Sequence, residues 1–154
     1  MLWRESGQIR LALETAFNDI LDTHMGGLPI ANTALSVQAI GFDRFNEDWL
    51  GVLLTPWCMN LLLLPGSDST WCGQASGTSI ERSFPYGTFE FTLGSETLLG
   101  MYAQCSLFSP MFQFADQAAA LATAQAALQG LLATPPEPRG ISRRDLLRGT
   151  IGKA

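Results

Sequence analysis

The feature that most constrains the fold of this chain is a run of 19 uncharged residues at positions 49–67. A run of that length is long enough to cross a bilayer as a helix. Pro56 and Asn60 interrupt it, however, and Asp48 and Asp68 flank it in place of the basic anchors typical of a membrane span. We therefore expect no membrane span and interpret the run as two buried elements joined near Pro56.

The second of these elements, residues 56–66, has no decisive periodicity, because a short buried helix and a buried strand are both mostly apolar. Pro56 suits the first turn of a helix, and Pro65 followed by Gly66 suits its end. These end signals favour a helix over residues 56–66.

Five segments predict strands. Residues 35–45 and 49–55 form a first pair joined by a turn, and residues 79–84 with 88–93 form the clearest hairpin. The segment 98–108 alternates between apolar and polar positions, which is typical of a strand with one buried face. The apolar residues that share one face in the last two strands are Phe89, Phe91, Leu93, Met101, Ala103, Cys105 and Leu107.

Two helices are expected. Residues 6–24 carry apolar side chains at helical spacing with charged residues on the other faces, and Ser6 is the expected N-cap. The second helix, residues 115–132, overlaps a stretch without any charge at 117–136. Such a helix either packs into a groove of its own sheet or presents a docking face to another protein. Its apolar stripe is predicted to comprise Ala118, Leu121, Leu128 and Leu132.

The length of 154 residues indicates one domain, and a chain that is 47% hydrophobic and 15% charged is unlike a disordered one. The order of the expected elements predicts an α+β fold, with an antiparallel sheet on which the N-terminal and C-terminal helices pack. We place this domain at residues 1–134. A proline-rich linker and a flexible basic tail follow at residues 135–154.

The net charge of −5 conceals an acidic body and a basic tail. Residues 1–138 carry four arginines and thirteen carboxylates, a net charge of −9, whereas residues 139–154 carry five basic residues and one aspartate, a net charge of +4. An acidic body is a poor nucleic-acid binder, so we expect no nucleic-acid partner. A segment of opposite charge is typical of one with a task of its own.

The candidate catalytic and metal-binding residues are few. Cys58, Cys72 and Cys105 form no CxxC pair and no even disulfide framework, and His24 is the one histidine. A zinc site typically needs four ligands in paired spacing, so we expect no metal or other cofactor and assign no catalytic residue. Unpaired thiols and an N-terminal region without an apolar signal run lead us to expect a cytoplasmic protein. The competing interpretation is a small thiol enzyme or metal carrier that uses these four residues.

The tail contains a sequence that resembles the twin-arginine export motif, Ser-Arg-Arg-x-Phe-Leu-Lys, with leucine for the phenylalanine and arginine for the lysine. We do not expect it to export the chain, since such signals are N-terminal and precede an apolar run. One interpretation is a solvated basic tail. The other is mimicry, in which the tail competes with the signal of an exported protein for an acidic groove on the body. The pseudo-signal comprises Ser142, Arg143, Arg144, Leu146, Leu147 and Arg148.

In several of its segments, the chain resembles the [NiFe]-hydrogenase assembly chaperones of the HybE, HupJ and HoxT type. The likeness spans most of the chain in the family's order, and the Thr-Pro-Trp and Pro-Tyr-Gly segments together are fairly specific. The segments that carry it are residues 52–57 (VLLTPW) with the apolar run to 66, residues 84–89 (FPYGTF), residues 102–110 (YAQCSLFSP) and residues 142–149 (SRRDLLRG).

This resemblance implies a non-catalytic, cytoplasmic factor for the maturation of an exported, membrane-bound hydrogenase. Its partners would be precursor subunits before twin-arginine export: the small subunit, which carries the signal, and the large subunit as a second candidate. Some members of the family carry a fused rubredoxin with two CxxC pairs. This chain has neither pair, so iron binding is not supported.

The Thr-Pro-Trp and Pro-Tyr-Gly segments are the candidate client-binding sites. Because proline and glycine occur in turns of most folds, the alternative is that both segments are structural turns. Trp57 and Trp71 each adjoin a cysteine in a loop-like context, and aromatic residues in such places are enriched at interfaces. The client-binding hypothesis assigns Thr55, Pro56, Trp57, Pro85, Tyr86 and Gly87.

Overall fold

The computed structural model describes residues 3–25, 29–71, 73–97 and 99–134. The predicted linker and tail, residues 135–154, therefore lie outside the described residues. In chain order, the elements are α1 (Ser6–Ile20), the π-helical turn η1 (Leu21–Met25), β1 (Gln38–Phe45), β2 (Asp48–Leu54), β3 (Met59–Pro65), β4 (Ser79–Ser83), β5 (Thr88–Glu96), β6 (Gly100–Phe108) and α2 (Gln117–Leu132).

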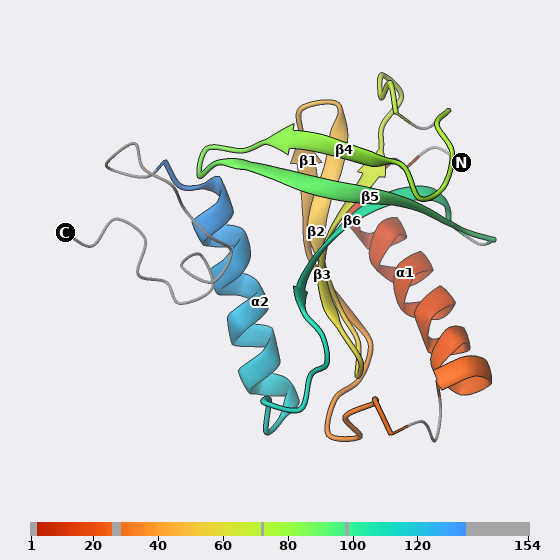
Figure 1. The fold of residues 1–154 in the computed structure, drawn as a ribbon, viewed down its shortest axis with the longest axis vertical. Coiled ribbons are helices and arrows are strands. Elements are labelled where there is room, and N and C mark those ends of the chain that lie inside the picture. The colour runs from red at the N-terminus through yellow and green to blue at the C-terminus, as the bar shows by residue number, and fades with distance from the viewer. Residues whose placement is uncertain (1–2, 26–28, 72, 98, 135–154) are drawn as a thin grey trace.

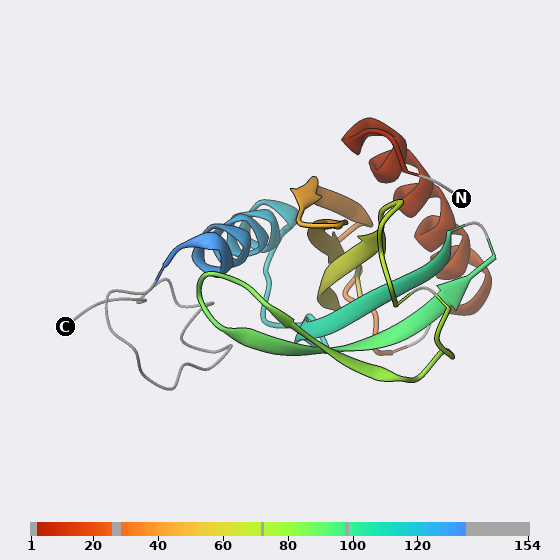
Figure 2. The ribbon, with the colours of Figure 1, turned by 90° about the horizontal axis from the view of Figure 1, so that it is seen from above.

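The strands form one antiparallel sheet in the order β1-β2-β3-β6-β5-β4. The two helices lie on opposite sides of this sheet, with α1 against β1 and α2 against β1 and β2 (Figure 1). The β4–β5 hairpin reaches past β6 toward the end of α2 (Figure 2), where the Tyr86 N–H donates to the Leu131 carbonyl oxygen at 3.1 Å. The predicted α+β fold and its antiparallel sheet are confirmed.

Two apolar clusters hold the helices on the sheet, and the central strands contribute to both. Val52 and Leu61 point into the cluster on the α2 side, whereas Leu53 and Leu62 point into the cluster on the α1 side. A strand that is covered on both faces has no solvent-exposed face, so its sequence is apolar throughout. This double burial accounts for the uncharged run at residues 49–67.

The predicted helix over residues 56–66 is wrong, because this segment contains β3 and Pro56 lies in the turn that precedes it. A strand buried on both faces lacks the alternation that would have identified it. The proline and glycine signals mark a hairpin turn and a strand end here. In the described part of the chain, no helix is long and apolar enough to span a membrane.

The helix ends and faces differ from the prediction in detail. Ser6 is the first residue of α1, and the N-cap is Glu5, whose side chain makes no capping hydrogen bond. Ala118 and Leu132, placed on the apolar stripe of α2, are exposed, because the stripe was set in the wrong phase. The buried side of α2 comprises Ala120, Ala124, Ala127, Leu128 and Leu131.

A buried carboxylate fixes the loop between β3 and β4. Asp48 is only 4% exposed and accepts hydrogen bonds from the Ser69 hydroxyl and from the Trp71 indole N–H, the latter at 3.2 Å to each oxygen. Trp71 is 1% exposed. The expectation that Trp71 lies near an interface is therefore wrong, since its ring completes the core and its N–H binds Asp48.

Candidate functional site

The Thr-Pro-Trp segment forms the β2–β3 turn, and the Thr55 side chain organises it. Thr55 Oγ1 accepts the N–H groups of Trp57 at 3.2 Å and Cys58 at 2.9 Å, and donates to the Cys58 carbonyl oxygen at 3.0 Å. Thr55 and Pro56 are buried, whereas Trp57 is half-buried. Of the three predicted residues in this turn, only Trp57 offers its side chain to a partner.

Asn32 ties this turn to the segment that precedes α2. Its backbone N–H donates to the Pro56 carbonyl oxygen at 2.8 Å. Its side-chain Nδ2 donates to the carbonyl oxygens of Met111 and Phe114, each at 2.9 Å. The Thr-Pro-Trp turn is thereby fixed beside the N-terminal end of α2.

The Pro-Tyr-Gly segment forms the β4–β5 turn. The N–H of Phe84 donates to the Gly87 carbonyl oxygen at 2.9 Å, and the N–H of Gly87 donates to the Phe84 carbonyl oxygen at 3.0 Å. Tyr86 is 2% exposed and is bonded through its N–H to Leu131 near the end of α2. Pro85 is exposed and Gly87 is half-buried, so these two residues form the accessible part of the turn.

The structure does not bring the two predicted segments together. The Thr-Pro-Trp turn lies beside the beginning of α2 and the Pro-Tyr-Gly turn beside its end (Figure 1). A helix of 16 residues is about 24 Å long. A partner that touched both turns would have to lie along α2.

The solvent side of α2 connects the two turns and carries no charge. We call this surface the α2 face. Its last residue, Leu132, is 45% exposed, and Phe112, in the loop before the helix, is 55% exposed. Solvated helix faces are normally rich in charged side chains, and an uncharged face with exposed apolar residues is typical of a protein contact. The α2 face comprises Ala118, Ala119, Ala122, Gln125, Gln129 and Leu132.

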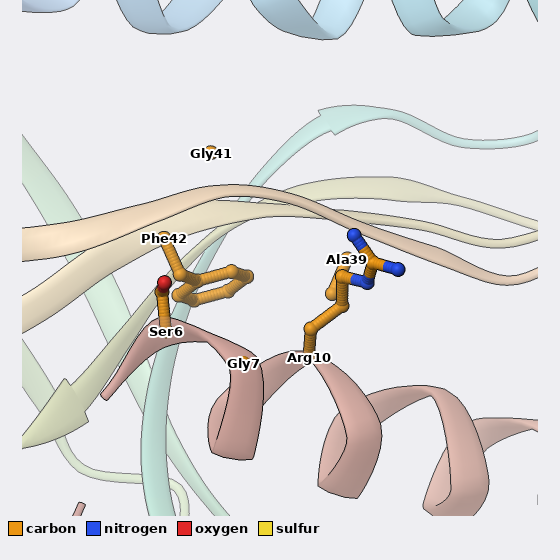
Figure 3. A pocket seen from close by; sticks show the side chains of 6 residues that line it. All are labelled: Ser6, Gly7, Arg10, Ala39, Gly41 and Phe42. Atoms are coloured by element: carbon orange, nitrogen blue, oxygen red, sulfur yellow. The ribbon is translucent and has the colours of Figure 1, made fainter. Parts of the chain in front are cut away.

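Two hollows flank β1, one on each side of the sheet. The α1–β1 hollow, of about 190 Å³, lies between Ser6, Gly7 and Arg10 of α1 and the edge of β1 (Figure 3). The β1–α2 hollow, of about 180 Å³, lies on the other side. Gly41 lines both hollows at a β-bulge and has a φ of 68°, which favours glycine. The apolar side chains of the β1–α2 hollow are Phe45, Leu50, Leu128 and Leu132, and its charged lining residues are Asp43 and Arg44.

The sequence pattern did not point to either hollow. The one local signal was Gly41 inside a predicted strand, since an isolated glycine there indicates a bulge or a close approach. The remaining lining residues come together only through the packing of α1 and α2 on β1.

Cys58 is not an activated thiol. Burial raises the pKa of the Cys58 thiol above its ordinary value of 9.0, and the hydrogen bond with Thr55 offsets part of that rise. Because the thiolate is the nucleophilic form, this shift lowers reactivity at neutral pH. Cys105 is buried in the α2-side cluster, whereas Cys72 and the side chain of His24 lie outside the described residues. Within the described ranges, no three His, Cys, Asp or Glu side chains are placed to hold a metal ion.

Fold and surfaces together define an α+β domain that offers turns, an uncharged helix face and small hollows to a protein partner. Comparison with known proteins gives its family. The family described as "[NiFe]-hydrogenase assembly, chaperone, HybE" matches residues 8–149. The chain belongs to this family, and the resemblance predicted from its motifs is confirmed.

Named relatives and a solved structure agree with this assignment. The hydrogenase expression/formation protein HupJ of Bradyrhizobium diazoefficiens is 42% identical over 149 residues, which cover 90% of this chain and 86% of HupJ. Protein HoxT of Cupriavidus necator is 44% identical over 137 residues, 82% of this chain and 76% of HoxT. The solution structure of HybE from Escherichia coli matches with a TM-score of 0.67 and 26% identity, over 88% of this chain and 85% of that one.

Proposed function

We propose that this chain is a non-catalytic cytoplasmic chaperone that binds precursor subunits of an exported, membrane-bound [NiFe] hydrogenase before twin-arginine export. The observation that carries the proposal is membership of a hydrogenase assembly chaperone family in a chain whose tail resembles the export signal. The small subunit, which bears such a signal, is the expected client. The large subunit is the second candidate.

The mechanism is binding without bond chemistry. A chaperone must hold its client while cofactors are inserted and then release it. A Kd of about 1 μM, or roughly −8 kcal/mol, meets both needs. An uncharged contact surface suits this task, because it gains free energy from apolar burial without the cost of leaving charges unpaired.

We place the client-binding surface along the α2 face, from Trp57 at one end to Pro85 and Gly87 at the other. Pro85 is exposed and Trp57 and Gly87 are half-buried, so all three are accessible to a client, which supports the assignment. The buried members of the predicted set, Thr55, Pro56 and Tyr86, would act by fixing the shape of the two turns. The length of α2 favours an extended client segment over a small ligand.

Two substitutions on the proposed surface and one on α1 test it. Trp57→Ala and Ala122→Arg should each weaken binding of purified precursor at least fivefold without lowering the melting temperature by more than a few degrees. Leu11→Arg, at a 70% exposed position on α1, is the matched control and should bind as the parent does. Equal affinity in all three variants would remove the α2 face from the proposal. A folding defect in Trp57→Ala would favour the purely structural role for its turn.

The tail residues 142–148 are proposed to compete with the client's signal, since they carry the same arginine pair and apolar positions. Their positive charge complements the acidic body.

Capture from cells tests the function as a whole. The full chain, affinity-tagged and expressed in cells that make the hydrogenase, should retain small subunit with its signal uncleaved. Retention of mature subunit alone, or of neither subunit, would contradict the proposal.

A further inference from the structure

We infer that the β1–α2 hollow is the site that binds the arginine–leucine segment of this chain's own tail, residues 142–148. The docked tail would lower the affinity for a client's twin-arginine signal, an effect that rests on the function proposed above. The docking itself does not depend on any client.

The size of the hollow selects the kind of occupant. At about 180 Å³ it is smaller than the roughly 300–1,000 Å³ of a site for a drug-sized ligand. It has room for one or two side chains of a peptide. Phe45, Leu50 and Leu128 make its floor apolar, and a leucine pair such as Leu146 and Leu147 matches that floor.

The charge of the hollow selects a basic segment. Asp43 and Phe45 share the α2 side of β1, because alternate residues of a strand point to the same face. Arg44 points to the opposite side, where its guanidinium lies 5.2 Å from the centre of the Trp49 ring. Arg44 also lines the hollow, but its guanidinium lies at the Trp49 ring on the other face of the sheet. Asp43 Oδ1 accepts the Arg44 backbone N–H at 2.8 Å, which leaves the other carboxylate oxygen to an incoming arginine.

The position of the hollow selects this chain's own tail. Leu132, the last residue of α2, lines the hollow and is 45% exposed, so the chain leaves the helix at the rim. Nine residues separate Leu132 from Ser142, which allows a reach of about 30 Å. A short tether holds its segment at an effective concentration of about 1 mM, so it outcompetes the tail of a second copy at micromolar protein.

The α1–β1 hollow is a poorer match. Arg10 rises from α1 beside that hollow, toward Ala39 (Figure 3). Arg10 is paired with Glu14 at 3.9 Å, and none of the described residues that line this hollow carries a carboxylate. The two hollows are similar in volume, so the Asp43 carboxylate of the β1–α2 hollow is the property that distinguishes them.

Amide chemical shifts of the full-length, ¹⁵N-labelled chain test the docking. The double substitution Leu146→Asp with Leu147→Asp should shift the amides of Asp43, Phe45, Leu128 and Leu132 in the β1–α2 hollow. Ile151→Asp places one aspartate at an apolar position of the tail outside the segment, and this control should leave those amides in place. Raising the salt to 0.5 M should reproduce part of the effect.

Three results would overturn the inference. Shifts confined to the tail would show that it is not docked. Shifts at Ser6, Gly7 and Ala39 would place it in the other hollow. Shifts that grow with protein concentration would make a second copy's tail the occupant.

A synthetic twin-arginine signal peptide tests the effect on clients. If the segment binds with a Kd of about 0.1 mM, an effective concentration of about 1 mM weakens the peptide's apparent affinity about tenfold. The double aspartate variant should therefore bind the peptide about tenfold more tightly than the parent, measured by fluorescence anisotropy. Equal affinities, with no shift in the hollow, would refute the docking and leave the chaperone function standing. Shifts in the hollow with no peptide bound by either protein would contradict the proposed function and leave the docking standing.

Discussion

Replacing Thr55 by valine should destabilise the fold more than any exposed threonine substitution, because one buried hydroxyl organises the whole β2–β3 turn. The change keeps the side-chain shape and removes Oγ1, the acceptor for the N–H groups of Trp57 and Cys58. A buried donor left without a partner costs about 1–3 kcal/mol. Two orphaned donors would cost about 2–6 kcal/mol, and because the turn is partly open to water at Trp57, we expect a loss of about 2–4 kcal/mol in the free energy of unfolding.

For a chain of this length, that loss corresponds to a fall in melting temperature of about 6–12 °C. Urea denaturation followed by tryptophan fluorescence measures the free energy directly, and calorimetry checks the temperature. Thr55→Ser, which keeps the hydroxyl, should cost only about 1 kcal/mol for the lost methyl group. Thr88→Val removes a hydroxyl that is exposed and bonded to Ser83 at 2.9 Å, and should stay within about 0.5 kcal/mol of the parent. If Thr55→Val were no more destabilising than Thr88→Val, the role given to Thr55 would be refuted.

Three further predictions concern the sheet and its thiol. Gly51→Ala should destabilise by about 1–3 kcal/mol, since its Cβ would lie 2.5 Å from the Phe42 ring, whereas Gly73→Ala, with no atom within 4 Å, should be neutral in the same urea assay. Asp48→Ala should cost about 2–4 kcal/mol in the same urea assay, because the buried indole N–H of Trp71 loses its acceptor. Alkylation of Cys58 by iodoacetamide should be slower than that of a free thiol at pH 7.5, and its rate should keep rising with pH beyond pH 9, where the rate of a free thiol levels off. Labelling of Cys58 as fast as that of a free thiol at pH 7.5 would contradict the raised pKa. Because the pKa of this thiol is higher in the folded than in the unfolded chain, its contribution to stability is present below pH 9 and is lost as the pH rises through the pKa of the folded state.

The local sequence pattern predicted the elements that have one buried and one solvent-exposed face. In β5, Phe89 and Phe91 are buried while Glu90 is exposed, so the alternation was visible in the sequence. The strand β3 was missed for the opposite reason: Leu61 and Leu63 lie in the cluster on the α2 side and Leu62 in the cluster on the α1 side, so its sequence does not alternate between apolar and polar residues. An antiparallel strand buried on both faces lacks the local pattern that identifies a strand, and only the tertiary packing reveals it.

The candidate site was predicted in part. The absence of charge along α2 marked its exposed face, and the Pro-Tyr-Gly segment was located as a hairpin turn. The Thr-Pro-Trp segment was expected to join two buried elements, but Pro56 was assigned to the start of a helix. The hydrogen bonds that fix this turn, however, join Asn32 to Met111 and Phe114, residues 79 and 82 positions away. The β1–α2 hollow likewise depends on the distant approach of Leu128 to Gly41, which no local pattern contains.

Binding of the precursor itself tests the central claim most directly. Isothermal titration of the full-length chain with the small-subunit precursor, and with the same subunit lacking its twin-arginine signal, separates recognition of the signal from recognition of the folded body. The proposed function predicts a Kd of about 1 μM for the precursor and at least tenfold weaker binding without the signal. Equal affinity for both forms, or no heat with either, would contradict it.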